Sequence, residues 1–278
     1  MIGAYSRVKQ IGAGSYGKVI LVKDKGGNYA CIKQIDMGKL SSRERKDASN
    51  EVRVLAALQH PYVVSFRESF SQRDNLYIVM DYAEGGDLYK KVEKTRRAGA
   101  AFAEPQIARW MAQSFLALKY IHEKHVLHRD LKSQNLFLCG KDTLKVGDFG
   151  ISKVLESGGG FAKTCVGTPF YLAPEICKER PYSWAADIWA MGIILHELCS
   201  LKVPFDAPNI EHLVKKITHG PIPRIPPRYS THLESLGADL LDRDYRRRPS
   251  AETVLQRPYF QEEIRSMLRS KDRSKGAL

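Results

Sequence analysis

The feature that most constrains this chain is the order of three short motifs in its middle: HRDLKSQN, then DFG, then APE. In the first motif, Asp130 stands two residues before Lys132 and five before Asn135, and Asp148 opens the second. A protein has little covalent chemistry to perform in phosphoryl transfer, so catalysis consists of placing charges. A carboxylate orients the attacking hydroxyl, a cation neutralises the transferring group, and an asparagine with a second aspartate holds Mg²⁺. The motifs therefore indicate phosphoryl transfer, whereas a lone HRD would also fit a buried ion pair in a turn.

Three glycines near the N-terminus, Gly12, Gly14 and Gly17, form a GxGxxG pattern within IGAGSYGKV. The same spacing opens the dinucleotide-binding fold, in which the glycines lie between a strand and a helix. Here the stretch that follows, KVILVKD, alternates like a strand and ends in turn residues. We therefore predict a β-hairpin with the glycines at its tip, where backbone N–H groups can approach phosphates. An ordinary glycine-rich hairpin is the alternative.

Lys33 lies in YACIKQI, a stretch that reads as a half-buried strand with apolar neighbours. A buried ammonium group without a counter-charge or a ligand is costly. Glu51 follows in a helix predicted over residues 41–59, with Ser41 or Ser42 as its N-cap. We expect the Glu51 carboxylate to pair with Lys33. A surface lysine and a solvated glutamate are the alternative.

The pattern along the chain changes from strands to helices, which predicts an α+β protein with two lobes. Strands are predicted over residues 5–12, 17–24, 28–35 and 75–82, and further helices over 104–124, 183–200 and 210–218. We expect a β-rich N-lobe over residues 1–83 and a mainly α-helical C-lobe over 84–260. A basic C-terminal tail over 261–278 is expected to form a short helix that frays.

The composition narrows the class of protein and its partners. The chain has 278 residues, of which 43% are apolar and 27% charged, as in a globular protein. Its net charge of +13 is dispersed, without zinc-finger spacing or a basic and aromatic stripe, so an acidic partner is favoured over nucleic acid. The longest apolar stretch, residues 188–201, is too short to span a bilayer. With five scattered cysteines and no apolar signal segment at the N-terminus, we expect a cytoplasmic protein.

Taken together, the motifs of residues 5–260 resemble those of a eukaryotic protein kinase domain. The phrases HRDLKSQNLFL, VGDFGISKVL and CVGTPFYLAPEI are most similar to the NIMA-related serine/threonine kinases, although WAA before Asp187 departs from the usual polar residues. The resemblance implies a two-lobed kinase fold that binds ATP and Mg²⁺ in its cleft and phosphorylates serine or threonine in proteins. Lys132, two residues after Asp130, is the serine/threonine rather than the tyrosine pattern.

The resemblance also assigns roles to single residues. Catalysis falls to Asp130, Lys132, Asn135 and Thr168, whose hydroxyl would bond the catalytic aspartate and lysine, while Asn135 and Asp148 hold the metal. The nucleotide-binding residues that it implies are Ile11, Gly12, Gly14, Gly17, Val19, Lys33, Glu51, Met80, Asp81 and Ala83.

Regulation and substrate choice follow from the same resemblance. Thr164 is where the family takes its activating phosphate, from an upstream kinase or by autophosphorylation in trans, and Arg129 would bind that phosphate. Ile151 after the DFG glycine predicts a preference for threonine acceptors. Glu175 of APE and Arg248 are expected to pair and anchor the segment between the motifs.

Two alternatives share the fold. A pseudokinase scaffold is disfavoured because the catalytic lysine, glutamate, aspartates and asparagine are all present. A small-molecule phosphotransferase is disfavoured because GTPFYLAPE, the platform for protein substrates, is complete. The family also implies a role in mitosis, at microtubule-organising structures such as the centrosome or basal body, or in cilia. This last implication rests on association alone.

Overall fold

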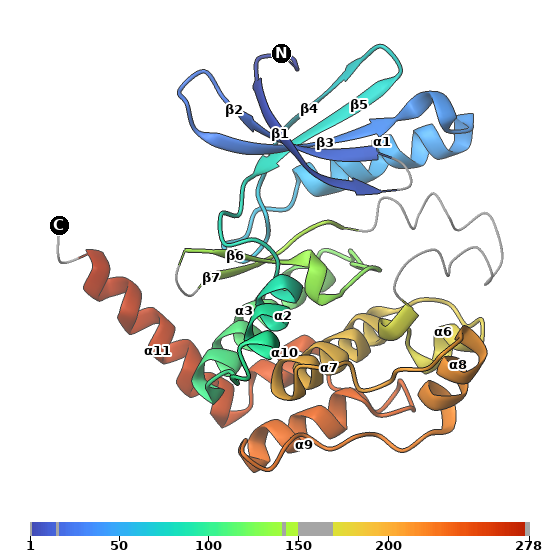
Figure 1. Cartoon of the computed structure of the whole chain (residues 1–278), viewed down its shortest axis with the longest axis vertical. Helices are drawn as coiled ribbons and strands as arrows, with labels where there is room; N and C mark the ends of the chain where they lie inside the picture. The colour runs from blue at the N-terminus through green and yellow to red at the C-terminus, as the bar shows by residue number, and fades with distance from the viewer. Residues whose placement is uncertain (1, 15–16, 141–142, 150–168, 276–278) are drawn as a thin grey trace.

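The structure, a computed structural model, describes residues 2–14, 17–140, 143–149 and 169–275. It has two lobes of different architecture (Figure 1). The first part of the chain forms an antiparallel sheet with one long helix beside it, and the rest is mainly helical. This arrangement confirms the predicted α+β, two-lobed kinase fold. The exact domain bounds at 83 and 260 stay predictions.

The sheet of the N-lobe has the strand order β1-β2-β3-β5-β4, and every neighbouring pair is antiparallel. Its strands are β1 (Ser6–Gly14), β2 (Gly17–Lys23), β3 (Tyr29–Asp36), β4 (Phe66–Gln72) and β5 (Asn75–Asp81). All but β4 were predicted. The sequence of β4, FRESFSQ, has few apolar residues because β4 is an edge strand with most of its side chains exposed.

The long helix of the N-lobe, α1 (Ser42–Ala56), follows a short turn of 3₁₀-helix, η1 (Met37–Lys39). Of the two predicted N-caps, Ser41 is the one used: its hydroxyl accepts from the Glu44 N–H, and the Glu44 carboxylate accepts from the Ser41 N–H at 2.7 Å. Ala48 and Val52 pack on the sheet. Glu51 lies on this helix, but its side chain is outside the described part.

The C-lobe is built around a helix that is buried on all sides. Its elements are α2 (Leu88–Arg97), α3 (Glu104–Glu123), η2 (Ser133–Asn135), β6 (Leu136–Cys139), β7 (Thr143–Val146), η3 (Pro169–Tyr171), α6 (Pro174–Cys177), α7 (Trp184–Ser200), α8 (Ile210–His219), α9 (Thr231–Leu240), α10 (Ala251–Leu255) and α11 (Pro258–Lys275). In α7 every residue from Ala185 to Cys199 is buried, as its apolar sequence predicts. No helix within the described ranges is both long and apolar enough to cross a membrane.

Helix α11 crosses the predicted boundary between C-lobe and tail at residue 260. Phe260 and Met267 are buried on the core, and the Arg109 side chain of α3 bonds the Glu263 carboxylate at 2.8 Å. The first part of the predicted tail is therefore a helix docked on the C-lobe, which extends away from it toward the C-terminus (Figure 1).

Candidate active site

A small hairpin joins two of the sequence motifs. Strand β6 begins directly after Asn135 and pairs with β7, with Leu136 opposite Val146. The end of β7 therefore lies beside the start of β6. The Gly147 N–H donates to the Asn135 carbonyl at 3.0 Å, and Asp148 follows. The β6–β7 hairpin therefore places Asn135 and Asp148, the two predicted metal ligands, side by side.

The Asp130 carboxylate is held by the two residues that the sequence places with it. Lys132 Nζ lies 2.8 Å from Asp130 Oδ2, and Asn135 Nδ2 donates to the same oxygen at 3.0 Å. Asn135 Nδ2 also donates to the Asp130 carbonyl at 2.7 Å. Because one amide group bonds both the backbone and the side chain of Asp130, the carboxylate has a fixed position in the turn. The structure thus brings together the three described residues that were predicted to be catalytic.

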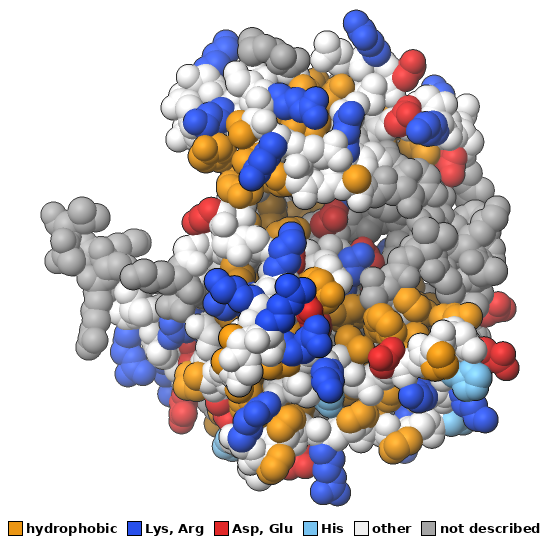
Figure 2. Space-filling model, viewed as in Figure 1, with side chains coloured by type: hydrophobic (Ala, Val, Ile, Leu, Met, Phe, Trp, Pro, Cys, Tyr) orange, Lys and Arg blue, Asp and Glu red, His pale blue; other side chains and the backbone are white. Residues whose placement is uncertain are grey.

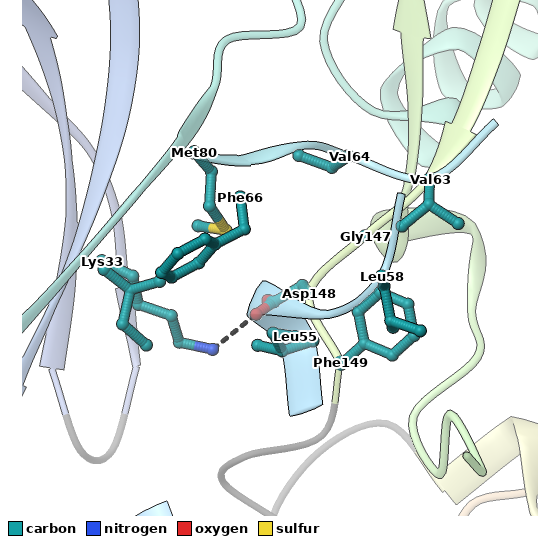
Figure 3. A pocket seen from close by; sticks show the side chains of 11 residues that line it. Lys33, Leu55, Leu58, Val63, Val64, Phe66, Met80, Gly147, Asp148 and Phe149 are labelled. Carbon is teal, nitrogen blue, oxygen red and sulfur yellow. Dashed lines mark hydrogen bonds and ion pairs between the residues drawn. The ribbon is translucent and has the colours of Figure 1, made fainter. Parts of the chain in front are cut away.

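Lys33 reaches across the cleft to Asp148. Its Nζ lies 2.5 Å from Asp148 Oδ1, and the two side chains are 17% and 41% exposed. Figure 3 shows this contact at the edge of a pocket whose walls include Phe66 and Met80 on one side and Phe149 on the other. The predicted pairing of Lys33 with Glu51 is untested and stays a prediction.

Two residues at the connector between the lobes, Asp81 and Ala83, were predicted to present backbone groups to adenine. Met80 lines the same pocket as Lys33, and its predicted place at the back of an adenine site stays a prediction. The Asp81 N–H donates to the Ser65 carbonyl at 3.0 Å and is committed to the fold. Among the described residues nothing accepts the Ala83 N–H, whose own carbonyl accepts from Gly86 at 3.2 Å. Of the two predicted adenine contacts, Ala83 is therefore the one with a donor to spare.

The glycine-rich segment is a hairpin, as predicted, and not a strand that leads into a helix. Strands β1 and β2 pair up to Gly14 opposite Gly17, while the tip, residues 15–16, lies outside the described part. Val19 stands opposite Gly12 on β1 and opposite Lys33 on β3. It therefore lies between these two predicted nucleotide-binding residues across the sheet. Ile11, on the neighbouring strand, is 39% exposed.

The glycines of the hairpin are required for different reasons. A Cβ on Gly17 would overlap the carbonyl oxygen of Gln34 on β3, so packing within the sheet excludes a side chain there. A Cβ on Gly12 would meet Val19 at 3.5 Å, an ordinary contact. Packing among the described residues therefore explains Gly17, whereas the predicted role of Gly12 at the phosphates stays a prediction.

A buried carboxylate, Asp187 of α7, holds the backbone just before Asp130. Asp187 accepts the N–H groups of His128 at 3.0 Å and Arg129 at 3.1 Å. The Tyr182 hydroxyl donates to it at 2.6 Å, and His122 Nε2 lies 2.9 Å away. Burial opposes the charge on Asp187, but the bonds from His122 and Tyr182 hold its pKa below the usual range.

The bonds from Asp187 support a backbone conformation that is unfavourable by itself. Arg129 has a positive φ of 66°, in a region that side-chain-bearing residues rarely occupy. The fully buried His128 ring packs on Phe149 with 4.7 Å between ring centroids, and burial lowers the His128 pKa, so the ring stays neutral. Asp187 thus stabilises a strained turn at the catalytic loop. The sequence pointed to Asp187 itself, but not to Tyr182 and His122 as its partners.

A second buried carboxylate connects η2, which follows the catalytic residues Asp130 and Lys132, to the 3₁₀-helix η3, which precedes APE. Glu197 of α7 accepts from the Ser133 hydroxyl at 3.1 Å and from the Tyr171 hydroxyl at 2.7 Å. Burial raises the Glu197 pKa, because these two neutral donors compensate only in part. Sequence analysis missed this cluster. The signal in the sequence was an acidic residue in a mainly apolar helix, because a buried acidic residue needs a partner.

The predicted pair of Glu175 and Arg248 is confirmed. Both guanidinium nitrogens Nη1 and Nη2 donate to the Glu175 carboxylate at 2.7 Å, and the two side chains are 3% and 0% exposed. Arg248 also bonds the Ala185 and Asp242 carbonyls and lies over the Trp189 ring. The pair fastens the end of the APE motif to the core of the C-lobe.

Several predicted residues fall outside the described part. They are Thr168, Ile151 and Thr164. The Arg129 side chain is exposed, and no described residue pairs with its guanidinium group. The predicted roles of these four residues stay predictions.

Comparisons with known proteins agree with this geometry. A protein-family model described as "Protein kinase domain" matches residues 5–260. Serine/threonine-protein kinase Nek1 of Mus musculus is 46% identical over 265 residues, which cover 95% of this chain and 22% of Nek1. Nek4 of Mus musculus is 43% identical over 94% of this chain and 33% of its own length. Nek11 of Homo sapiens is 38% identical over 95% and 41%.

The chain spans less than half the length of these relatives. Its similarity to them is therefore a similarity between domains, and it supports the resemblance that the motifs predicted. Because the family model covers most of the chain, the chain belongs to the protein kinase domain family, and within that family it is a NIMA-related serine/threonine kinase domain.

Proposed function

We propose that the chain transfers the γ-phosphoryl group of ATP to serine or threonine side chains of proteins. The observation that carries this proposal is the geometry around Asp130. Its carboxylate is fixed by Lys132 and Asn135, and Asn135 adjoins the Asp148 that contacts Lys33. One cleft therefore holds a carboxylate for the acceptor hydroxyl, two lysines for phosphate charge and two candidate metal ligands.

The residues of the cleft fit ATP and Mg²⁺. The Asp148 carboxylate and the Asn135 amide oxygen are hard oxygen donors of the kind that Mg²⁺ prefers, and the nitrogen of Asn135 is already engaged with Asp130. The Ala83 N–H, for which no described residue is an acceptor, can bind an adenine acceptor. When bound, ATP supplies the phosphoryl group and Mg²⁺ offsets its charge.

The remaining chemistry belongs to the chain's own side chains. Asp130 accepts a hydrogen bond from the acceptor hydroxyl and orients its oxygen toward the phosphoryl group. Lys132, held at Asp130, places a positive charge beside the same point. Asp187 keeps the turn rigid, so this alignment costs no reorganisation when the substrate arrives.

Incubation of the chain with radiolabelled ATP, Mg²⁺ and casein tests the function, with Asp130→Asn as the control. Transfer by the wild type, to casein or to itself, and none by the control would support the proposal. Transfer by neither would favour the catalytically impaired scaffold as the function. A label on small molecules but not on proteins would favour a small-molecule phosphotransferase.

Substrate preference and regulation form the finer part of the proposal. The β-branched Ile151 supports threonine over serine, because a stiff side chain leaves room for the threonine methyl group. Phosphate on Thr164, added by an upstream kinase or in trans, would pair with the exposed Arg129. Matched threonine and serine peptides test the first idea, which a serine preference would contradict. Full activity of Thr164→Ala without phosphate at that site would contradict the second.

The cellular role is proposed from the family alone. It comprises a cytoplasmic location at cytoskeletal structures such as the centrosome or basal body, and a part in mitosis or in cilia. Localisation of the tagged chain in dividing and ciliated cells tests this role. A diffuse distribution in both would count against it.

A further inference from the structure

The exposed face of α2, the helix that packs on η2, carries a row of positive charge. Lys90, Lys94 and Arg97 are spaced by four and three residues, so they share one face of the helix. All three are exposed, while Leu88 and Val92 on the opposite face are buried in the core. We call these three residues the basic stripe. Figure 2 shows Lys and Arg side chains gathered over the region where Figure 1 places α2.

Most of this charge has no acidic partner. Lys90 pairs with Asp87 at 2.7 Å, but Lys94 and Arg97 form no ion pair with a described residue. Glu93, the one acidic residue within α2, is taken by Arg96 at 2.6 Å. The stripe therefore presents positive charge to solvent.

Helix stability does not account for the whole arrangement. Cations in the last turn, such as Arg97, interact favourably with the helix dipole. Lys90 and Lys91 lie in the first turn, where the same dipole disfavours cations, and Lys90 and Lys94 repel each other at a spacing of four. The helix keeps these unfavourable charges although they lower its stability. Their presence therefore suggests that the positive charge has a function.

The position of α2 suggests that use. The buried face of α2 packs on η2, the turn that contains Asn135, and on β6. The basic stripe lies on the other side of the same short helix, about one helix diameter from η2. From Lys90 to Arg97 the stripe covers seven residue steps and spans about 10 Å, which matches three or four residues of an extended peptide.

We propose that the basic stripe binds an acidic segment of the protein substrate, rich in aspartate or glutamate and lying beside the acceptor residue. This inference deepens the proposed kinase function and rests on it. Exposed charge pairs of this kind act mainly on encounter and affinity, so the stripe should change KM more than kcat. Its effect should weaken as salt is added.

The test uses two acceptor peptides that differ only in a flanking segment of four glutamates or four glutamines, placed before or after the acceptor. The charge-reversal variant is Lys90→Glu/Lys94→Glu. The matched control is Arg265→Glu/Arg269→Glu, a pair with the same spacing on exposed positions of α11. Binding of the labelled peptides is followed by fluorescence anisotropy, and phosphorylation by steady-state kinetics.

We expect the wild type and the control to prefer the acidic peptide by about fivefold or more in kcat/KM and in binding, the size expected for two or three exposed charge pairs. Lys90→Glu/Lys94→Glu should lose this preference while it phosphorylates the neutral peptide as before. Lys90→Gln/Lys94→Gln, which adds no acid next to Asp87, should lose part of it. Equal binding of both peptides by the wild type, or equal losses in stripe and control variants, would overturn the proposal.

Two further outcomes separate this proposal from its alternatives. If no peptide is phosphorylated but the acidic one binds through the stripe, the docking site stands and the kinase function fails. A single-stranded oligonucleotide is the competing ligand for a basic surface. If it binds through the stripe while both peptides bind equally, the site is one for nucleic acid and the proposal is wrong.

Discussion

The two sides of the cleft are held in different ways. On the C-lobe side, Asp187 is fully buried and its carboxylate engages the two backbone N–H groups before Asp130 together with two side chains. On the N-lobe side, Lys33 has one described partner, Asp148, which is 41% exposed. Asp187 is thus part of the core of the C-lobe, whereas the pair across the cleft is partly exposed to water.

This difference has a physical consequence. Removing one member of a buried ionic network strands its partner away from water, so the network is costly to disturb. A partly exposed pair is screened, and its members can exchange one partner for another at little cost. The fold therefore fixes the groups that would orient the acceptor hydroxyl, and leaves Lys33 free to exchange Asp148 for a phosphate.

The largest expected effect is on stability, at the buried pair of the C-lobe. Arg248→Ala leaves Glu175 buried without its partner and should lower the free energy of unfolding by about 3–5 kcal/mol. Urea denaturation measures the loss. The matched control is Arg246→Ala, whose side chain is 75% exposed and pairs with Asp244 on the surface. Similar losses in both variants would show that burial is not what makes Arg248 important.

The next effect concerns activity, and it contrasts the two sides of the cleft. Asp130→Asn should lower turnover by at least about 10², the usual contribution of a positioned proton acceptor, with ATP affinity little changed. Lys33→Met should also impair turnover, because it misplaces the phosphates and leaves Asp148 unpaired. Isothermal titration with ATP and single-turnover kinetics separate binding from transfer. Asp130→Asn with more than about a tenth of wild-type turnover would contradict the assigned role.

The smallest effect is a pH dependence at Glu197. Its folded-state pKa is raised above the ordinary value of 4.5, so the stability that this carboxyl contributes is complete below about pH 4.5 and is lost as pH rises through the folded pKa. Glu197→Gln keeps one acceptor oxygen for the Ser133 and Tyr171 hydroxyls, replaces the other with an N–H donor, and cannot ionise. The melting temperature of the variant relative to wild type should therefore rise as the pH increases above about 4.5. A difference that is constant with pH would contradict the buried ionisation.

The sequence was most informative where function requires fixed spacing or a long apolar run. It predicted the glycine hairpin, the Lys33 strand, helix α7 and the pair of Glu175 with Arg248. It did not predict β4, because an edge strand carries polar residues on its exposed positions. The contact of Lys33 with Asp148 joins residues 115 apart, which only the arrangement of the lobes brings together.

The polar clusters of α7 could be predicted only in part. An aspartate and a glutamate inside a buried helix indicate that partners exist, since buried charge must be compensated. Which partners they are depends on how the catalytic loop and the segment around Tyr171 pack on that helix. That packing is a property of the tertiary structure and leaves no local pattern in the sequence.

Amide hydrogen exchange tests most directly the central claim that the C-lobe holds its catalytic loop in place before nucleotide binds. The His128 and Arg129 N–H groups, both bonded to Asp187, should exchange slowly in the free chain and change little when Mg-ATP is added. The Ala83 N–H, unpaired among the described residues, should exchange quickly and slow down with nucleotide. Fast exchange at His128 and Arg129 that slows only with Mg-ATP would contradict the claim.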